Sequence, residues 1–161
     1  MPRPIRATIH LEALKHNLAV LRARAQDARV WAVVKANAYG HGAIEVARTL
    51  ERAGVDYLGV ADVEEALSLR AAGIKTRILA WLHDPTDDFE KAVAKDIDLA
   101  VSSADQLMRV VKAAQAQGAI GRIHIKVDTG LSRNGVTMTE LPDLLEQVLA
   151  EVKRGSIISV G

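Results

Sequence analysis

The chain of 161 residues carries 21 basic and 20 acidic side chains, contains no cysteine, and is 49% hydrophobic. This charge balance gives no reason to expect nucleic acid or an anionic membrane as a partner, and the lack of cysteine excludes disulfides, thiolate zinc sites and cysteine nucleophiles. No apolar run approaches the roughly 20 residues that span a bilayer, and the basic N-terminus lacks the apolar segment of a secretory signal. We therefore expect a soluble, globular, cytoplasmic protein.

The first segment predicts a short strand at Arg6–His10 and then a helix from about Leu11. From there on, short apolar or β-branched runs alternate with helical patterns, and most runs begin about 20 to 26 residues after the previous one, the length of a right-handed βα unit. Helices are clearest at 62–72 and 104–117, where apolar residues recur at helical spacing. The expected strands are 30–35, 57–61, 77–81, 98–102 and 122–128, with a last one from 156.

Helix ends carry their own signals. Two residue pairs have the spacing of a capping box, in which two side chains near a helix start satisfy its free backbone N–H groups. These pairs are Asp62 with Glu65 and Ser103 with Gln106. Glycines stand where helices should stop, at Gly54, Gly73 and Gly118.

Alternating βα units with near-continuous apolar strands favour a parallel sheet covered by helices. Two α/β architectures fit this pattern, an open doubly wound sheet and a (β/α)₈ TIM-type barrel. A complete barrel takes roughly 200 residues or more, whereas this chain supplies about six strands and stops at Gly161, directly after one. We interpret the chain as an incomplete (β/α)₈ barrel with about six of its eight βα units.

The stretch VWAVVKANAYGHG contains the first candidate site. Side chains alternate along a strand, so Trp31, Val33 and Lys35 should share one face. In a barrel, Lys35 would close the inward row at the carboxyl-end mouth, where active sites of such barrels lie. A lysine there can act as a base or condense with an aldehyde once its pKa is lowered. The alternative is a solvated lysine that happens to end a strand.

Tyr39 should begin the loop that follows this strand. Its phenol could hold a phosphate, while Gly40 and Gly42 let backbone N–H groups approach the anion. The alternative is a loop tyrosine that only packs its ring. His41 stands between the two glycines with no partner carboxylate or second histidine in view, so we expect a structural or indirect role for it.

A second cluster of charge lies in HIKVDTGLSRNGV, where His124, Lys126 and Asp128 share a face and Arg133 follows. Charged groups that converge at a strand end are costly unless they pair or serve a site. Both outcomes stay open: a salt-bridge cluster of Lys126, Asp128 and Arg133, or a site in which Arg133 lies near Lys35. His124 lies deeper and should be a hydrogen-bonded core histidine.

Two further features lie at the end of the third expected strand. Trp81 either forms a wall of the same mouth or simply packs. The segment HDPTDDF, residues 83–89, holds three carboxylates, but their spacing matches no calcium loop. It therefore predicts a loop and a helix cap, and no metal site is expected.

Together, these stretches resemble bacterial alanine racemase. AVVKANAYGHG is similar to that family's pyridoxal-phosphate lysine signature, and KVDTGLSRNGV to its downstream lysine–aspartate–arginine segment. GVADVEEALSLRAAGI and ILAWLH resemble intervening strands and loops, so the resemblance covers essentially the whole chain. It implies that residues 1–161 are the N-terminal part of a pyridoxal-phosphate-binding (β/α)₈ barrel domain, with the C-terminal barrel units and a β-rich domain absent. The family works as a head-to-tail homodimer.

The resemblance also implies an activity, the interconversion of L-alanine and D-alanine through pyridoxal 5'-phosphate, which supplies D-alanine for peptidoglycan. Lys35 would carry the cofactor and act as the base on the D-alanine face, and Tyr39 would hold the cofactor phosphate. Arg133 would lie by the cofactor's phenolic oxygen and the substrate carboxylate. Lys126, which is carbamylated in several members, would position Arg133.

Racemisation needs a base on each face of Cα. The second base of the family, a tyrosine from the partner's C-terminal domain, has no counterpart in these residues. The isolated chain is therefore expected to racemise alanine poorly or not at all. The alternatives are a broad-specificity or serine racemase of the same fold and, from another class, a non-catalytic half-barrel assembly module.

Overall fold

The structure is a computed structural model that describes residues 5–161 as alternating strands and helices. The strands are β1 (Trp31–Val33), β2 (Tyr57–Val60), β3 (Arg77–Ala80), β4 (Asp98–Val101), β5 (Gly121–Ile125) and β6 (Ile157–Ser159). The helices are α1 (Leu11–Ala25), α2 (Lys35–Tyr39), α3 (Ala43–Arg52), α4 (Val63–Ala71), α5 (Phe89–Ala94), α6 (Ala104–Gln117) and α7 (Leu141–Arg154).

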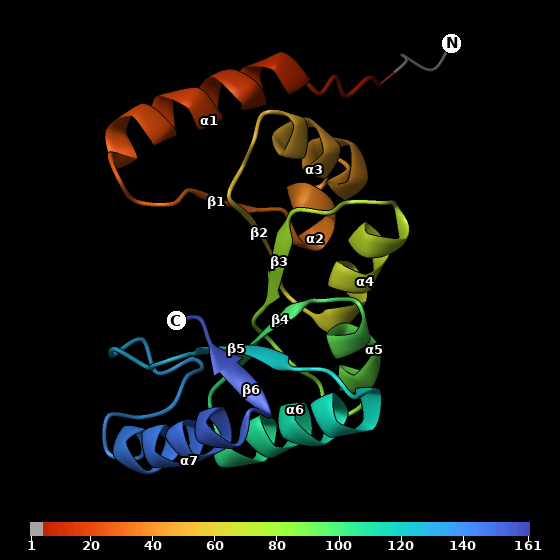
Figure 1. Cartoon of the computed structure of the whole chain (residues 1–161). Helices are drawn as coiled ribbons and strands as arrows, with labels where there is room; N and C mark the ends of the chain where they lie inside the picture. The colour runs from red at the N-terminus through yellow and green to blue at the C-terminus, as the bar shows by residue number, and fades with distance from the viewer. Residues whose placement is uncertain (1–4) are drawn as a thin grey trace.

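The strands form one six-stranded parallel sheet whose spatial order is their order along the chain, β1 to β6. A doubly wound sheet reverses its strand order at a switch point, so this sequential order excludes it. The helices follow the outer side of an arc and the strands lie along its inner side (Figure 1). The sheet is the wall of an incomplete (β/α)₈ barrel, which confirms the fold expected from the sequence.

The hydrophobic core lies between the outer face of this wall and the helices. The outward side chains of the strands are almost completely buried, each no more than 1% exposed: Leu58, Val60, Ile78, Ala80, Leu99, Val101, Ile123 and Ile157. The apolar stripe expected on α6 meets them, and Leu107, Val110 and Ala114 are fully buried. Burial of the outer apolar face stabilises the sheet against the helices. The inner face of the sheet can therefore carry polar groups.

The expected helix caps are confirmed. The Asp62 carboxylate accepts the backbone N–H of Glu65 at 2.8 Å, and the Ser103 hydroxyl accepts that of Gln106 at 3.2 Å. Asp88 caps α5, as expected for a loop and helix cap over residues 83–89. None of the helices within residues 5–161 is long and apolar enough to cross a membrane.

Three expectations about the extent of strands are wrong. The strand expected over 122–128 ends at Ile125, so Lys126 and Asp128 lie beyond it. Arg6–His10 forms no strand, because an extended segment needs a neighbouring strand for its backbone hydrogen bonds and none lies beside it within residues 5–161. The strand expected over 30–35 ends at Val33, and Lys35 begins the short turn α2 instead of ending the strand. The last strand-like contact of this segment is the N–H of Val34, which donates to the carbonyl of Gly59 at 2.8 Å.

Candidate functional site

The carboxyl ends of the strands bring two lysines to the same rim of the wall. Lys35 comes directly after Val34, whose N–H bonds to β2. Lys126 follows β5, and its own N–H donates to the carbonyl of Val101 at the end of β4, at 2.8 Å. In barrels of this kind the carboxyl-end rim is where catalytic side chains gather. Both lysines named by the sequence therefore lie where chemistry is expected.

The turn α2 has an unusual backbone. Ala36, Asn37, Ala38 and Tyr39 all lie in the left-handed region, with φ between +50° and +54°. This conformation costs an ordinary residue roughly 1 to 2 kcal/mol. Four consecutive non-glycine residues in it form a strained segment, and such strain persists only where surrounding contacts hold it. Its place directly after Lys35 makes it part of the candidate site.

Backbone and side-chain hydrogen bonds close this turn. The N–H of Ala38 donates to the carbonyl of Val34 at 2.8 Å, and the N–H of Gly42 donates to that of Asn37 at 2.9 Å. The side-chain oxygen of Asn37 accepts the N–H of Ala43 at the start of α3, at 2.8 Å. The turn therefore joins β1 to α3 as one connected unit.

Tyr39 ends the left-handed turn, where the sequence had placed the start of a loop, and its side chain is exposed. Gly40 and Gly42 follow with φ of +84° and +91°, a conformation that glycine adopts without strain. Nδ1 of His41 donates to the carbonyl of Ala38 at 2.8 Å. This contact within the turn agrees with the structural role expected for His41.

The second charged stretch does not form the salt-bridge cluster that the sequence left open. The ammonium group of Lys126 donates to the backbone carbonyl of Trp81 at 3.3 Å. The carboxylate of Asp128 accepts the N–H groups of Ser132 and Gly130, and these bonds hold the pKa of Asp128 below its usual range. Among residues 5–161, no ion pair joins Lys126, Asp128 and Arg133.

Burial lowers the pKa of Lys126, and the positive charge of Arg133 lowers it further. A larger share of the Lys126 amine is therefore neutral than in a solvated lysine. This influence of Arg133 couples the two cations electrostatically, although the Arg133 side chain is exposed.

Trp81 lies across the inner face of β2, against Gly59. A Cβ atom on Gly59 would overlap Cζ3 of the Trp81 ring and lie 2.9 Å from its Cη2. Only glycine leaves room for the ring at this point, so the tryptophan forms part of the inner wall below the rim. This close approach is a contact that the sequence could not reveal.

We expect Gly59→Ala to lower the free energy of unfolding by about 1 to 3 kcal/mol, because the new methyl group overpacks the inner face. Urea unfolding followed by tryptophan fluorescence measures the change. In a Trp81→Leu background the same substitution should cost less, because the ring is gone. An equal cost in both backgrounds would contradict the proposed clash.

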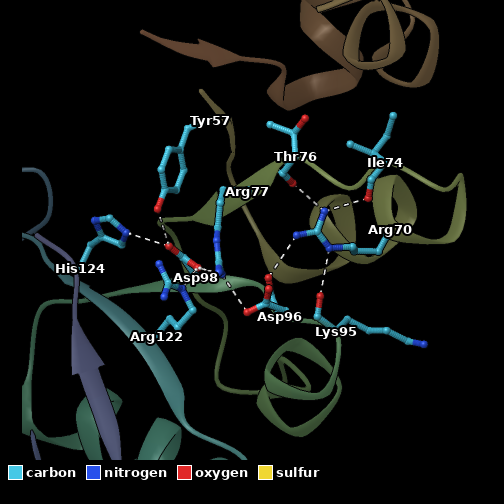
Figure 2. A network of polar contacts seen from close by, with 10 residues as sticks. All are labelled: Tyr57, Arg70, Ile74, Thr76, Arg77, Lys95, Asp96, Asp98, Arg122 and His124. Carbon is cyan, nitrogen blue, oxygen red and sulfur yellow. Dashed lines mark hydrogen bonds and ion pairs between the residues drawn. The ribbon is translucent and has the colours of Figure 1, made fainter. Parts of the chain in front are cut away.

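The inner face of the wall also holds a polar network, shown in Figure 2. At its centre is Asp98, whose side chain is fully buried. Its carboxylate accepts four donors: Nε of Arg122 at 2.9 Å, Nε2 of His124 at 3.1 Å, the hydroxyl of Tyr57 at 3.2 Å and Nη1 of Arg77 at 3.4 Å. The expectation that His124 is a hydrogen-bonded core histidine is confirmed.

Burial raises the pKa of Asp98, but hydrogen bonds from His124 and Arg122 and the charge of Arg122 outweigh it. The net pKa of Asp98 is therefore lowered, and the carboxylate is ionised at neutral pH. The Trp31 ring stacks on Tyr57 with centroids 4.3 Å apart, and it meets His124 edge-on. The network lies toward the amino ends of the strands and forms the floor beneath the rim.

Sequence reasoning missed the charged members that join His124 in this network, Arg77, Asp98 and Arg122. A signal was present, because these three residues of alternating sign stand at or next to the start of three successive strands. In a parallel sheet, first residues of neighbouring strands lie near one another, so opposite charges there can pair. Within residues 5–161, no three histidine, aspartate or glutamate side chains gather in a way that could hold a metal ion.

Comparison with known proteins gives one consistent answer. The family described as alanine racemase, N-terminal domain, matches residues 9–160. The alanine racemase of Mycolicibacterium smegmatis is 48% identical over 159 residues, which cover 97% of this chain and 41% of that protein. The crystal structure of alanine racemase from D-cycloserine-producing Streptomyces lavendulae superposes with a TM-score of 0.91 at 44% identity, and the match covers 94% of this chain and 40% of that one.

The alanine racemase of Streptomyces coelicolor A3(2) superposes with a TM-score of 0.89 at 40% identity, over 92% of this chain and 40% of that one. This chain thus spans about two-fifths of the length of the relatives it matches. Both the sequence comparison and the structural superposition cover nearly all residues of this chain. The chain belongs to the family of alanine racemase N-terminal domains.

Proposed function

We propose that this chain is the N-terminal barrel portion of an alanine racemase that interconverts L-alanine and D-alanine with pyridoxal 5'-phosphate. The observation that carries the proposal is the position of Lys35, at the carboxyl-end rim and at the entrance to a strained left-handed turn. The family membership and the relatives named alanine racemase support it. In the proposal, the remaining barrel units and a β-rich domain belong to the rest of the protein, which works as a homodimer.

The residues present fit the cofactor. An aldehyde needs an amine partner, which Lys35 supplies. A phosphate needs donors on an open surface: the Tyr39 side chain is exposed, and a Cβ atom on Gly40 or Gly42 would meet no other atom within 4 Å. The backbone beside Tyr39 is therefore open to an approaching anion. Arg133 offers a cation that can bind a carboxylate or a phenolic oxygen.

When bound, pyridoxal phosphate supplies an electron sink that stabilises the carbanion left when a proton leaves Cα. The Lys35 amine would remove or return that proton on the D-alanine face, and Arg133 would hold the substrate carboxylate. Proton transfer at the opposite face of Cα requires a second base on that face. We place that base in the part of the protein outside this match, contributed by the partner subunit.

Lys126 is proposed as the residue that positions Arg133. Reaction of its neutral amine with carbon dioxide would form a carbamate and release a proton, replacing a cation by an anion able to pair with Arg133. The lowered pKa of Lys126 favours this reaction, because only the neutral amine is a nucleophile.

One observation favours a second function, assembly with another chain. β1 and β6 are the two edge strands of the sheet, and the outer edge of each has no partner strand within residues 5–161. Trp31, Val33 and Ile158 on these two strands are between 37% and 41% exposed. Unpaired strand edges with apolar neighbours promote association. In this alternative Lys35 is a solvated lysine with no special reactivity.

Incubation with pyridoxal phosphate, reduction with borohydride and peptide mass spectrometry separate the two functions. The lysine amine condenses with the aldehyde and releases water, and hydride then reduces the carbon–nitrogen double bond to a stable secondary amine. We expect the label on Lys35, with more than about tenfold preference over exposed lysines because the turn and Tyr39 direct the cofactor there. Lys35→Arg should abolish this label, whereas Lys112→Arg, on α6, should leave it unchanged. Labels spread evenly over the lysines would contradict the proposal.

A further inference from the structure

We infer that Glu65 is a positioning residue for Lys35, because its carboxylate holds the left-handed turn that orients the lysine. The inference rests on the proposed role of Lys35. Glu65 lies in the next βα unit, yet one carboxylate oxygen accepts the backbone N–H of Ala36 at 2.6 Å. Ala36 is the residue directly after Lys35 and the first residue of the left-handed run.

The Glu65 carboxylate supplies a hydrogen-bond acceptor for the backbone N–H of Ala36. The N–H of Ala36 has no acceptor among the backbone hydrogen bonds that close the turn in residues 34–43. A carboxylate acceptor makes a hydrogen bond about twice as strong as a neutral one. The bond therefore offsets part of the strain of the left-handed run, at the residue that follows Lys35 directly.

The position of the Glu65 carboxylate is itself well determined. The backbone N–H of Glu65 donates to the Asp62 carboxylate at 2.8 Å, and the second Glu65 oxygen accepts the N–H of Ala61 at 2.9 Å. These two bonds form the cap of α4, and α4 is packed into the core through Ala66 and Leu69. Glu65 thus links a rigid helix start to the turn α2 beside it (Figure 1).

A second cap in the same chain separates the capping role from the positioning role. Gln106 holds the equivalent place in α6, and its side-chain oxygen accepts only from Ser102, from the N–H at 2.8 Å and the hydroxyl at 3.0 Å. It reaches no neighbouring βα unit through these bonds. An amide oxygen is therefore sufficient to cap such a helix, and the second acceptor of Glu65 serves the turn.

The test compares Glu65→Gln with Gln106→Ala in the 161-residue chain. In Glu65→Gln the new side-chain amide has one oxygen for two N–H groups, so its NH₂ group would face either Ala61 or Ala36. We expect the Ala36 amide to exchange with solvent about 10 to 100 times faster, because it loses one charge-assisted hydrogen bond. Nuclear magnetic resonance measures this exchange without cofactor. Gln106→Ala should leave the Ala36 exchange rate unchanged.

Labelling gives the functional readout. With pyridoxal phosphate and borohydride, Glu65→Gln should lower the rate of Lys35 labelling about tenfold and leave labelling of other lysines unchanged, because misorientation of one reacting group slows only its own reaction. Glu65→Asp, which keeps the charge but is one methylene shorter, should recover part of the rate. Thermal unfolding of both cap variants verifies that each chain is folded.

Two results would overturn the inference. One is an Ala36 amide exchange rate in Glu65→Gln that equals the wild-type rate. The other is an equal loss of Lys35 labelling in Glu65→Gln and Gln106→Ala. Failure of the proposed function has a different signature. The wild-type chain would then show no preference for Lys35, while the exchange of the Ala36 amide would still respond to Glu65.

Discussion

Replacing Asp98 by asparagine is expected to lower the free energy of unfolding by about 3 to 5 kcal/mol, the usual cost of removing one partner from a buried ion pair. The asparagine amide has nearly the same shape but only one acceptor oxygen. Its NH₂ group would face donors, and Arg122, whose side chain is only 19% exposed, would lose its counter-charge. Urea unfolding followed by tryptophan fluorescence is a direct measurement, because Trp31 stacks on Tyr57, a member of the network.

A matched control lies two residues away. Asp96 pairs with Arg77 at 2.8 Å, but its side chain is 66% exposed. Exposed ion pairs contribute about 0 to 1 kcal/mol, and asparagine tolerates the left-handed φ of +52° found at this residue. Asp96→Asn should therefore leave stability nearly unchanged. Equal effects of the two substitutions would show that burial of Asp98 does not decide the cost.

The effect of Asp98→Asn should depend on pH in a defined direction. The pKa of Asp98 is lowered in the folded state, so its contribution is present above the unfolded pKa of about 3.9 and is lost as pH falls through the folded value. The difference between wild type and Asp98→Asn should thus be full at neutral pH and narrow below about pH 3.9. A difference that widens in acid would contradict this assignment.

Arg70→Met should destabilise the chain by about 2 to 4 kcal/mol, because a single guanidinium serves four backbone carbonyls. Nε donates to Lys95, Nη1 to Ile74 and Thr76, and Nη2 to Asp96, all between 2.7 and 3.1 Å (Figure 2). These bonds fix the loop between α4 and β3 against the turn between α5 and β4. The ammonium group of Arg70→Lys cannot reach all four acceptors, so this variant should recover less than half of the loss.

Arg48→Met is the control for charge and side-chain packing. Arg48 pairs with Glu45 and donates to one carbonyl, that of Ala72, and its side chain is 42% exposed. Its removal should cost no more than about 1 kcal/mol. Hydrogen exchange at residues 74–76 and 95–97 should accelerate in Arg70→Met and not in Arg48→Met. If urea unfolding gives the same loss of unfolding free energy for both variants, the four hydrogen bonds of Arg70 do not contribute more than the one of Arg48.

Local signals in the sequence were sufficient for most of the secondary structure. The expected range of α6, 104–117, agrees with the structure at both ends, because a cap at Ser103, an apolar stripe and Gly118 all act within a few residues. The strand at Arg6–His10 was wrong for the opposite reason. Its residues favour an extended conformation, but a strand exists only where a partner strand accepts its hydrogen bonds, and that is not a local property.

The candidate site shows the same division. The sequence predicted a role for Lys35 and Lys126, because each lies near the carboxyl end of an expected strand and belongs to a motif that resembles the family. It did not predict the left-handed run after Lys35, since alanine and tyrosine rarely adopt this conformation by themselves. Contacts from outside the run, among them the carboxylate of Glu65, hold it in place.

The sequence by itself determined the βα rhythm, the helix caps, the buried outer face and the family resemblance, because each depends on residues close in the chain or on a linear motif. The sequence favoured a barrel over a doubly wound sheet through chain length and family resemblance, and the strand order seen in the tertiary structure confirmed it, since strand order is a property of the whole sheet. Only the tertiary structure decided that Arg77, Asp98 and Arg122 meet in one network. Their pairing depends on strand register, which places side chains about twenty residues apart in the sequence within hydrogen-bonding distance.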